Sequence, residues 1–339
     1  MVSPLRRRPL GKTGLTVTEL GFGAAPLGDL YAILDEDAAL GAVKAAVAAG
    51  VNLFDVAPLY GHGLAEHRLG SVLRGLPRES FVLSTKVGRW MDPRRPRGNG
   101  SGYTGGLPHA AVIDYSRDGT LRAIEQSLLR LGLDRIDILL IHDVDVRNHG
   151  AANIDRRFAE AMEGAYRALD ALRAEGVIRA IGVGVNEAEM CERFARAGDF
   201  DCMLLAGRYT LLEQDSLDGF MKLAQEKRIG VLMGGVFNSG ILATGPVPGA
   251  KFDYADAPPA ILARVGRIER VCRAHGVPLP VAAARFPLGH PAVASVVLGG
   301  VTAAEVERNR TAIDTPVPAQ LWRDLVAEGL LRPDAPLPE

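Results

Sequence analysis

The chain has 339 residues, 47% of them hydrophobic, so it is long enough to bury a large core. Its 39 basic and 40 acidic residues nearly cancel, which argues against nucleic acid or an anionic membrane as a partner. The sequence shows no apolar stretch near the roughly 20 residues of a membrane helix, no signal peptide, and three widely spaced cysteines that fit neither a metal motif nor a disulfide framework. We therefore expect a cytoplasmic protein without a metal site, while its oligomeric state stays open.

Short apolar runs recur along the chain, and each is typical of a buried strand in a parallel sheet. They cover residues 16–20, 53–55, 81–86, 136–142, 178–183, 202–205, 230–233 and 295–298. Segments with helical spacing stand between them, most clearly at residues 36–50, 119–132, 168–176 and 219–230. This alternation, without a linker or a change of composition, predicts a single α/β domain over residues 1–339. Its fold would be a (β/α)8 TIM barrel, with a doubly wound open sheet as the alternative.

Two connections are too long and too rich in glycine to be simple turns. They cover residues 88–108, after the third predicted strand, and residues 235–259, after the seventh. Connections of this length commonly bind ligands or cover a site. We expect both to lie at the C-terminal face of the barrel.

Four side chains that can hold or move a proton stand at or just beyond strand ends. Asp55 ends the second strand, Tyr60 lies in the loop that follows it, and Lys86 and His142 end the third and fourth strands. Each alone has a plain structural reading, such as a helix cap, a surface charge or a core histidine. In a barrel, however, the carboxyl ends of the strands meet at one face, so we expect the four to converge there.

Such a group of side chains would suit the interconversion of a carbonyl and an alcohol. A tyrosine has an ordinary pKa of about 10, and a lysine ammonium nearby lowers it, so Lys86 would make Tyr60 a usable acid or base. Asp55 would keep the lysine charged, and His142 would orient a substrate oxygen. The hydride would have to be exchanged with a group from outside the chain. A barrel aldolase or isomerase that uses Lys86 as a Schiff base is the alternative.

The segments that carry these residues resemble the aldo-keto reductase family. "LFDVAPLYGHG", "LSTKVG" and "LLIHD" match its tetrad at Asp55, Tyr60, Lys86 and His142, and the likeness runs from about residue 8 to residue 309. The resemblance implies the barrel fold, a nicotinamide cofactor and hydride transfer with Tyr60 as general acid or base. Some members of the family act mainly as cofactor-binding regulatory subunits, which is a further alternative.

Within the family, "IHDVD" and "GVGVNEAE" resemble a branch of sugar 1-dehydrogenases that act on L-fucose, D-threo-aldoses or L-galactose. This implies oxidation of the C1 hydroxyl of an aldose to the lactone, with Tyr60 as base. Pyridoxal 4-dehydrogenase activity and general aldehyde or ketone reduction are the alternatives. The expected substrate-binding residues are Tyr60, Trp90, His142 and Asp143, with Tyr103 as a possible second aromatic wall.

The resemblance also assigns contacts to the cofactor. Gly23 and Ala24 would lie at the nicotinamide ribose, and Asp55 would also contact the cofactor. The N-terminus of the helix beginning near Thr302 would face an anion. The chain departs from the family pattern at two places. After the fifth strand, Asn186 would bind the carboxamide or cap a helix. After the sixth, Ala206 replaces a glutamine, and Tyr209, three residues beyond, would stack on a ring or fill the core. The remaining expected contacts are Phe237, Asn238, Ser239, Gly240, Gly299, Gly300, Val301, Thr302, Glu305, Arg308 and Asn309.

The segment "LGGVTAAEVERN" bears on the choice between NAD and NADP. Family members that use NADP often carry a basic residue and a Gln or Arg where this chain has Val301 and Glu305. A carboxylate there would repel a 2′-phosphate and accept a hydrogen bond from a free 2′-hydroxyl. Arg308 would have the opposite effect if it turned toward the ribose. We therefore expect a preference for NAD, with NADP as the alternative.

Overall fold

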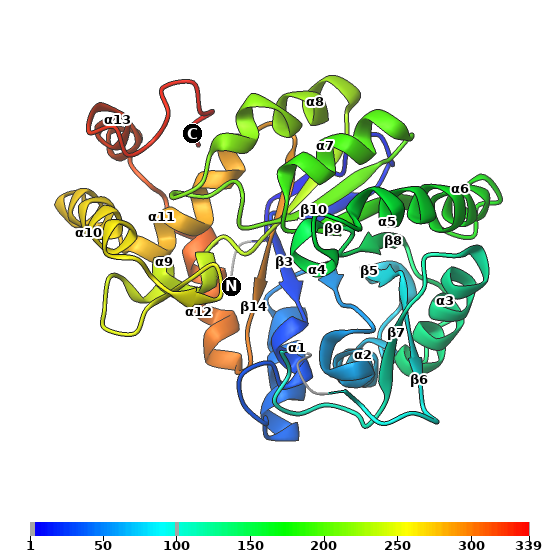
Figure 1. Ribbon diagram of the computed structural model, residues 1–339. Coiled ribbons are helices and arrows are strands. Elements are labelled where there is room, and N and C mark those ends of the chain that lie inside the picture. Colours follow the sequence, from blue (N-terminus) through cyan, green and yellow to red (C-terminus); the bar gives the residue numbers. More distant parts are fainter. Residues whose placement is uncertain (1–3, 99–101, 339) are drawn as a thin grey trace.

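The computed structural model describes residues 4–98 and 102–338. Eight strands, each parallel to its neighbours, close into a barrel, which confirms the predicted (β/α)8 fold (Figure 1). Around the barrel the order is β3, β4, β5, β8, β9, β10, β11 and β14, returning to β3. The strands are β3 (Leu20–Gly23), β4 (Leu53–Asp55), β5 (Val82–Val87), β8 (Ile138–His142), β9 (Ala180–Val185), β10 (Cys202–Ala206), β11 (Gly230–Gly234) and β14 (Val293–Gly299).

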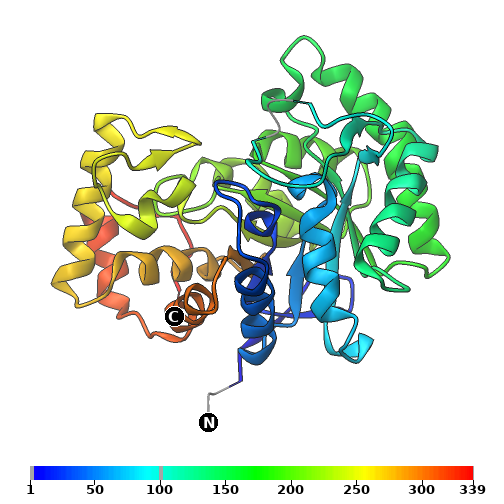
Figure 2. The same cartoon turned by 90° about the horizontal axis from the view of Figure 1, so that it is seen from below.

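A helix follows each strand and returns the chain to the other end of the barrel. These helices are α1 (Glu36–Ala48), α2 (Leu64–Leu73), α3 (Arg117–Leu131), α6 (Arg167–Ala174), α7 (Ala188–Ala197), α8 (Phe220–Lys227), α11 (Leu279–Arg285) and α12 (Ala303–Asp314). Two more, α10 (Pro259–Ala274) and α13 (Ala319–Ala327), pack on each other outside this ring, at the left of Figure 1 and again on that side in Figure 2. Short helices α4 (Val146–His149) and α5 (Ile154–Glu160) come after β8, and α9 (Ile241–Thr244) comes after β11.

The first predicted strand, residues 16–20, is wrong in its position. Residues 16–18 form β2 (Thr16–Thr18), which pairs antiparallel with β1 (Arg7–Pro9) in a hairpin outside the barrel, and the barrel strand β3 begins only at Leu20. Leu15 and Val17 of the hairpin region are buried together with residues from inside the barrel. Two short strands with one residue between them read as a single apolar run, so the pattern does not separate them.

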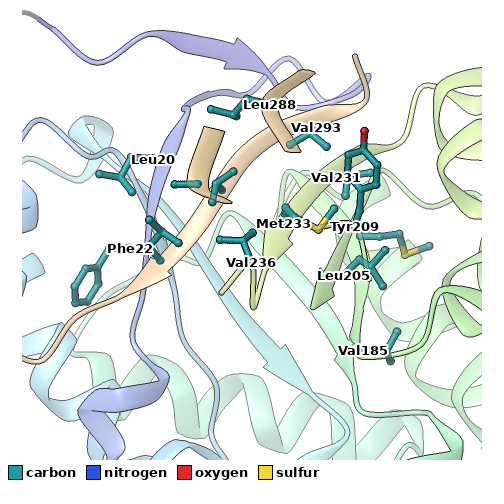
Figure 3. Close-up of a cluster of buried hydrophobic side chains, with 14 of the residues drawn as sticks. Leu20, Phe22, Val185, Leu205, Tyr209, Val231, Met233, Val236, Leu288 and Val293 are labelled. Atoms are coloured by element: carbon teal, nitrogen blue, oxygen red, sulfur yellow. The ribbon is translucent and has the colours of Figure 1, made fainter. Parts of the chain in front are cut away.

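The core has two layers because side chains alternate along each strand. One layer fills the barrel interior, and the other lies between strands and helices. Figure 3 shows part of the outer layer, where Leu20 and Phe22 of β3, Leu205 of β10 and Met233 of β11 are buried with Tyr209.

All three cysteines, Cys191, Cys202 and Cys272, are buried free thiols, and burial raises the pKa of each. Within the described ranges, no helix combines the length and the apolar character that crossing a membrane requires. In the same ranges, no three His, Cys, Asp or Glu side chains gather as a metal ion would need.

Both long connections contain secondary structure. The first holds β6 (Arg89–Asp92), which pairs antiparallel with β7 (Ala110–Ile113), so a hairpin is inserted between β5 and α3; residues 99–101 lie outside the described part. The second holds α9 and a smaller hairpin made of β12 (Lys251–Phe252) and β13 (Ala255–Asp256). Because they follow β5 and β11, both begin at the carboxyl ends of the barrel strands.

Candidate active site

A cavity of about 370 Å³ lies at the carboxyl ends of the barrel strands. The four predicted side chains, Asp55, Tyr60, Lys86 and His142, all line it. The sheet register brings them together, since Asp55 is the last residue of β4 and His142 the last of β8, while Lys86 is the penultimate residue of β5. We call this space the mouth cavity.

Lys86 and Asp55 form a buried ion pair at the base of the mouth cavity. The Lys86 Nζ donates to Asp55 Oδ2 at 2.7 Å and to the Val56 carbonyl at 2.9 Å. The Ser84 hydroxyl donates to the other carboxylate oxygen of Asp55 at 2.9 Å. Lys86 is 1% exposed and Asp55 3%. The charges therefore compensate each other out of water, and the hydrogen bonds fix the ammonium in place.

Tyr60 lies against this pair, with the Lys86 Nζ 4.8 Å from its ring centroid. Burial raises the pKa of Tyr60 well above its ordinary value, and the carboxylates of Asp55 and Asp143 raise it further. The net shift is thus opposite to the lowering that was expected from Lys86. The physical reason is that burial dominates and that the charge of Lys86 is compensated by its pair with Asp55.

His142 faces Tyr60 from β8. The two rings are 5.9 Å apart at their centroids and nearly perpendicular. Burial lowers the pKa of His142 well below its ordinary value, and the cations of Lys86 and Arg89 lower it further. The imidazole is therefore neutral near pH 7, so it can donate one hydrogen bond to a substrate oxygen without carrying charge.

Two residues that support His142 were missed in the sequence. The Tyr115 hydroxyl donates to the His142 carbonyl at 2.9 Å. Arg89 Nη1 donates to Asp143 Oδ2 at 2.9 Å, and Asp143 Oδ1 is 3.3 Å from His142 Nε2. Both come from the β6–β7 hairpin region, 27 and 54 residues away from their partners, so no local pattern marks them.

The expected substrate-binding residues divide into two groups. Asp143 lines the mouth cavity with Tyr60 and His142, and so does Tyr103, whose ring centroid is 6.2 Å from that of Tyr60. Trp90 is not among the described residues that line the cavity. Its indole lies under the Arg122 guanidinium and donates to Asp114 at 3.2 Å.

A third aromatic side chain at the mouth cavity was not foreseen. Tyr254, at the turn between β12 and β13, lines the cavity and lies under the Arg147 guanidinium. Asp253 beside it pairs with Arg147 at 3.1 Å and with Arg208 at 3.2 Å. The small hairpin is thereby attached to segments that follow β8 and β10. Tyr254 was not predicted, because it is far along the chain from the four residues at the strand ends and no local pattern connects it with them.

Two glycines present bare backbone to the mouth cavity. Gly23 and Gly299 line it, and a Cβ at Gly23 would meet the Val297 side chain at 3.1 Å, while one at Gly299 would meet Pro26 at 2.8 Å. Ala24 is buried behind them, where its N–H donates to the Asp55 carbonyl. Close approach of glycine backbone is typical of sites that bind dinucleotides, so these residues fit a nicotinamide cofactor.

The residues at the two departures from the family pattern, and Tyr209 beside them, take definite positions. Asn186 lines the mouth cavity, and the capping residue of α7 is Glu187, so the alternative of Asn186 as a helix cap is wrong. Ala206 also lines the cavity. Tyr209 is fully buried and packs on Phe286 with a centroid separation of 5.1 Å, so it fills the core.

The segment after β11 lies beside the mouth cavity. Asn238 is buried, accepts a hydrogen bond from the Thr210 hydroxyl at 2.6 Å and donates to the Gly207 carbonyl at 3.2 Å. Its amide therefore braces the loop. Ser239, in the left-handed backbone region at φ 62°, accepts from the Tyr254 N–H, and Gly240 follows at φ 104°. Phe237 is partly buried against the core.

The start of α12 holds the residues expected at the adenosine end. Thr302 caps the helix, and its hydroxyl accepts from the Glu305 N–H. The Glu305 carboxylate accepts from the Val301 N–H at 2.8 Å, and Arg308 stands 3.8 Å from it. The Asn309 amide donates to the Gly299 carbonyl, next to Gly300. Glu305 thus keeps a negative charge at the helix N-terminus, where it is favourable.

Comparison with known proteins places this geometry in context. The model of the Aldo/keto reductase family matches residues 19–327. The chain is 43% identical to a pyridoxal 4-dehydrogenase of Microbacterium luteolum, covering 96% of this chain and 98% of that protein. It is 39% identical to a D-threo-aldose 1-dehydrogenase of a Pseudomonas species, covering 94% and 96%. The solved holo form of an aldo-keto reductase from Bacillus halodurans shares the fold, with a TM-score of 0.75, 24% identity and 97% of each chain covered.

Proposed function

The chain belongs to the aldo/keto reductase family of nicotinamide-dependent oxidoreductases, and we propose that it oxidises the C1 hydroxyl of a cyclic aldose to the lactone. One observation carries the proposal: Tyr60, His142 and Asp143 line a single cavity in front of the buried Lys86–Asp55 pair. The cavity thus offers a proton acceptor, a neutral hydrogen-bond donor and a carboxylate to a substrate rich in hydroxyl groups. An aldose of the L-fucose, D-threo-aldose or L-galactose type has this chemistry.

Each side chain has one task in this proposal. Tyr60, as the phenolate, removes the proton of the C1 hydroxyl, and His142 orients the same oxygen. Asp55 holds Lys86, whose ammonium offsets the negative charge that the Tyr60 oxygen carries before it accepts the proton. The cofactor, when bound, accepts the hydride. Residues that would hold it are the glycines at positions 23 and 299, together with Asn186 and the segment 237–240.

Pyridoxal is the second candidate substrate. The aromatic rings of Tyr60, Tyr103 and Tyr254 line the same cavity and suit a flat pyridine ring. A relative named for pyridoxal oxidation at 43% identity supports the same candidate. In water pyridoxal closes to a cyclic hemiacetal, as an aldose does, so the reacting C–O group is chemically equivalent in the two.

A Schiff-base aldolase or isomerase receives no support from the site. An amine nucleophile must lose its proton, whereas the Lys86 ammonium is bonded to Asp55 and to the Val56 carbonyl. Both contacts stabilise the charged form. We propose that Lys86 stabilises negative charge on the Tyr60 oxygen and does not act as a nucleophile. Treatment with borohydride in the presence of an aldose should therefore leave the protein unlabelled.

We propose NAD as the preferred cofactor, on the strength of Val301 and Glu305. The Glu305 carboxylate stands at the start of α12, where a 2′-phosphate would meet its charge. Glu305→Gln combined with Val301→Arg should raise the ratio of kcat/KM for NADP to that for NAD. Glu307→Gln, an exposed change on the same helix, is the matched control. A native enzyme that prefers NADP would contradict the assignment.

The decisive experiment for the reaction is a substrate panel. L-fucose, L-galactose, D-arabinose and pyridoxal are each assayed with NAD and with NADP. Lactone formation from one of the sugars, with reduction of the cofactor, is the expected result. Turnover of pyridoxal alone would select the second candidate. No turnover on any of the four, with cofactor still bound, would favour a cofactor-binding regulatory subunit.

A further inference from the structure

The buried pair of Arg89 and Asp143 stands beside the proposed reaction centre. Arg89 is 6% exposed, and its Nη1 donates to Asp143 Oδ2 at 2.9 Å. The other carboxylate oxygen, Oδ1, lies 3.3 Å from His142 Nε2. An ionised carboxylate has about four acceptor positions. Since Asp143 also lines the mouth cavity, its oxygens can accept further hydrogen bonds from a molecule inside it.

The β6–β7 hairpin sets this arrangement from outside the barrel. Gly88 turns the chain at φ 96°, and a side chain there would meet the Tyr115 ring, with its Cβ only 2.3 Å from that ring. Arg89 follows at once as the first residue of β6. Tyr115, shortly after β7, holds the carbonyl of His142. One insertion therefore orients both His142 and its neighbour Asp143.

Stability alone does not explain why the Arg89–Asp143 pair is present. Burying an ion pair of this kind adds little net stability, because desolvation offsets the attraction. Asp143 also sits in the left-handed backbone region at φ 55°, which is uncommon for a residue with a side chain, although aspartate tolerates it better than most. An ion pair of little net stability and an uncommon backbone conformation at one position beside a cavity point to a role in binding.

We propose that Arg89 positions Asp143 to accept a hydrogen bond from the hydroxyl group on the carbon next to the reacting one. The inference rests on the proposed function and narrows its substrate class to cyclic hemiacetals that carry such a hydroxyl. The geometry supports this inference. In a sugar, the oxygens on two neighbouring carbons are about as far apart as two hydrogen-bonded atoms, and His142 Nε2 and Asp143 Oδ1 are 3.3 Å apart. The two side chains can therefore bind two neighbouring sugar oxygens, one each.

The first test uses the native enzyme and two sugars. D-arabinose and 2-deoxy-D-ribose differ only in the hydroxyl at C2, because removing it abolishes the C2 stereocentre. A hydrogen bond to a charged group predicts that kcat/KM favours D-arabinose by about 10-fold to 100-fold. Equal efficiencies would overturn the inference and leave the proposed function standing. No turnover of any aldose would overturn both.

The second test uses variants of the pair. Asp143→Gly removes the acceptor without backbone strain. The loss of its charge beside Tyr60 affects both sugars alike, so the ratio of kcat/KM for D-arabinose to that for 2-deoxy-D-ribose isolates the lost hydrogen bond and should fall close to one. Arg89→Met should lower the same preference. If Arg89 acts through Asp143, the double variant should behave as Asp143→Gly alone. Arg94→Gln, which removes an exposed guanidinium from its pair with the buried Asp92 on the same hairpin, is the control and should keep the native preference.

If the two substitutions change the preference for D-arabinose independently of each other, Arg89 does not position Asp143. A preference that survives Asp143→Gly would remove Asp143 from the recognition of the hydroxyl. Circular dichroism of each variant verifies that the fold is retained. Should a variant not fold, the comparison of the two sugars on the native enzyme still decides the inference.

Discussion

At the scale of single residues, the surroundings of Tyr60 favour its protonated form, which can donate a proton, over the phenolate, which can accept one. Its pKa is raised by burial and by Asp55 and Asp143, so the protonated phenol is the stable form near pH 7. Oxidation by proton removal should then become faster as the pH rises, while reduction is favoured at lower pH.

Replacing Tyr60 by Phe tests its role directly. The ring and its packing stay, and only the titrating oxygen is lost. General acid–base catalysis contributes about 10² to 10⁴ in rate, so kcat should fall by that factor while the cofactor still binds. Steady-state kinetics and a fluorescence titration with the cofactor measure the two quantities. A loss below about tenfold would exclude Tyr60 as the proton acceptor.

The pH profile separates the contributions of Asp55 and Lys86. Asp55→Asn removes a charge that raises the pKa of Tyr60, so the profile for oxidation should move to lower pH. Lys86→Met leaves the Asp55 charge uncompensated, so its profile should move to higher pH. The rate of sugar oxidation from pH 6 to 11 measures both. Shifts in the same direction would show that the two residues do not act as an ion pair on Tyr60.

At the scale of elements, the β6–β7 hairpin depends on Gly88. An alanine there would have to adopt φ 96° and place its Cβ 2.3 Å from the Tyr115 ring. We expect Gly88→Ala to lower the free energy of unfolding by about 1–3 kcal/mol and to lower kcat, because Tyr115 holds His142. Urea unfolding and kinetics measure these effects.

Gly14→Ala is the matched control for that experiment. Gly14 also has a positive φ, 73°, but no atom lies within 4 Å of a Cβ built there. It therefore reports the backbone strain without the clash, and its loss of stability should be smaller, with kcat unchanged. Equal losses in the two variants would mean that the contact with Tyr115 has no energetic role.

The sequence predicted those elements whose signal is local. Seven barrel strands follow from apolar runs, and Asp55, Lys86 and His142 follow from polar residues at the ends of those runs. The strand β2 was merged with the start of β3, because buried side chains in a hairpin strand and in a barrel strand leave the same apolar pattern, and β1 was not predicted. Arg89 and Tyr254 escaped because their partners are far away in the chain, and only the closed barrel brings them together.

At the scale of the whole molecule, buried histidines make the fold sensitive to acid. Burial lowers the pKa of His290 to about 4, and His62 and His142 also have lowered pKa values. A group with a depressed pKa in the folded state binds protons more readily when unfolded. The stability it contributes is therefore present above about pH 6.5 and is lost as the pH falls below that value.

His290 offers a test of this behaviour away from the mouth cavity. Its Nδ1 accepts from the Ala292 N–H, and its ring packs against Tyr209. Between pH 7.5 and pH 5, the native protein should lose about 2 kcal/mol of unfolding free energy through this residue. His290→Gln should lose correspondingly less over the same range, as measured by urea unfolding at both pH values. Identical pH dependence in the two proteins would contradict the assignment.

Because every cysteine is buried, chemical labelling of the thiols can report local unfolding of the protein. Cys191, Cys202 and Cys272 sit on α7, on β10 and on α10, and none reaches the surface. A thiol-specific reagent can modify a cysteine only after the segment around it has separated from the core. The order in which the three cysteines become labelled would show which part of the barrel opens first, and no residue has to be introduced for this. Because no native thiol is accessible, a cysteine introduced at a chosen surface position would be the only one to react in the folded enzyme.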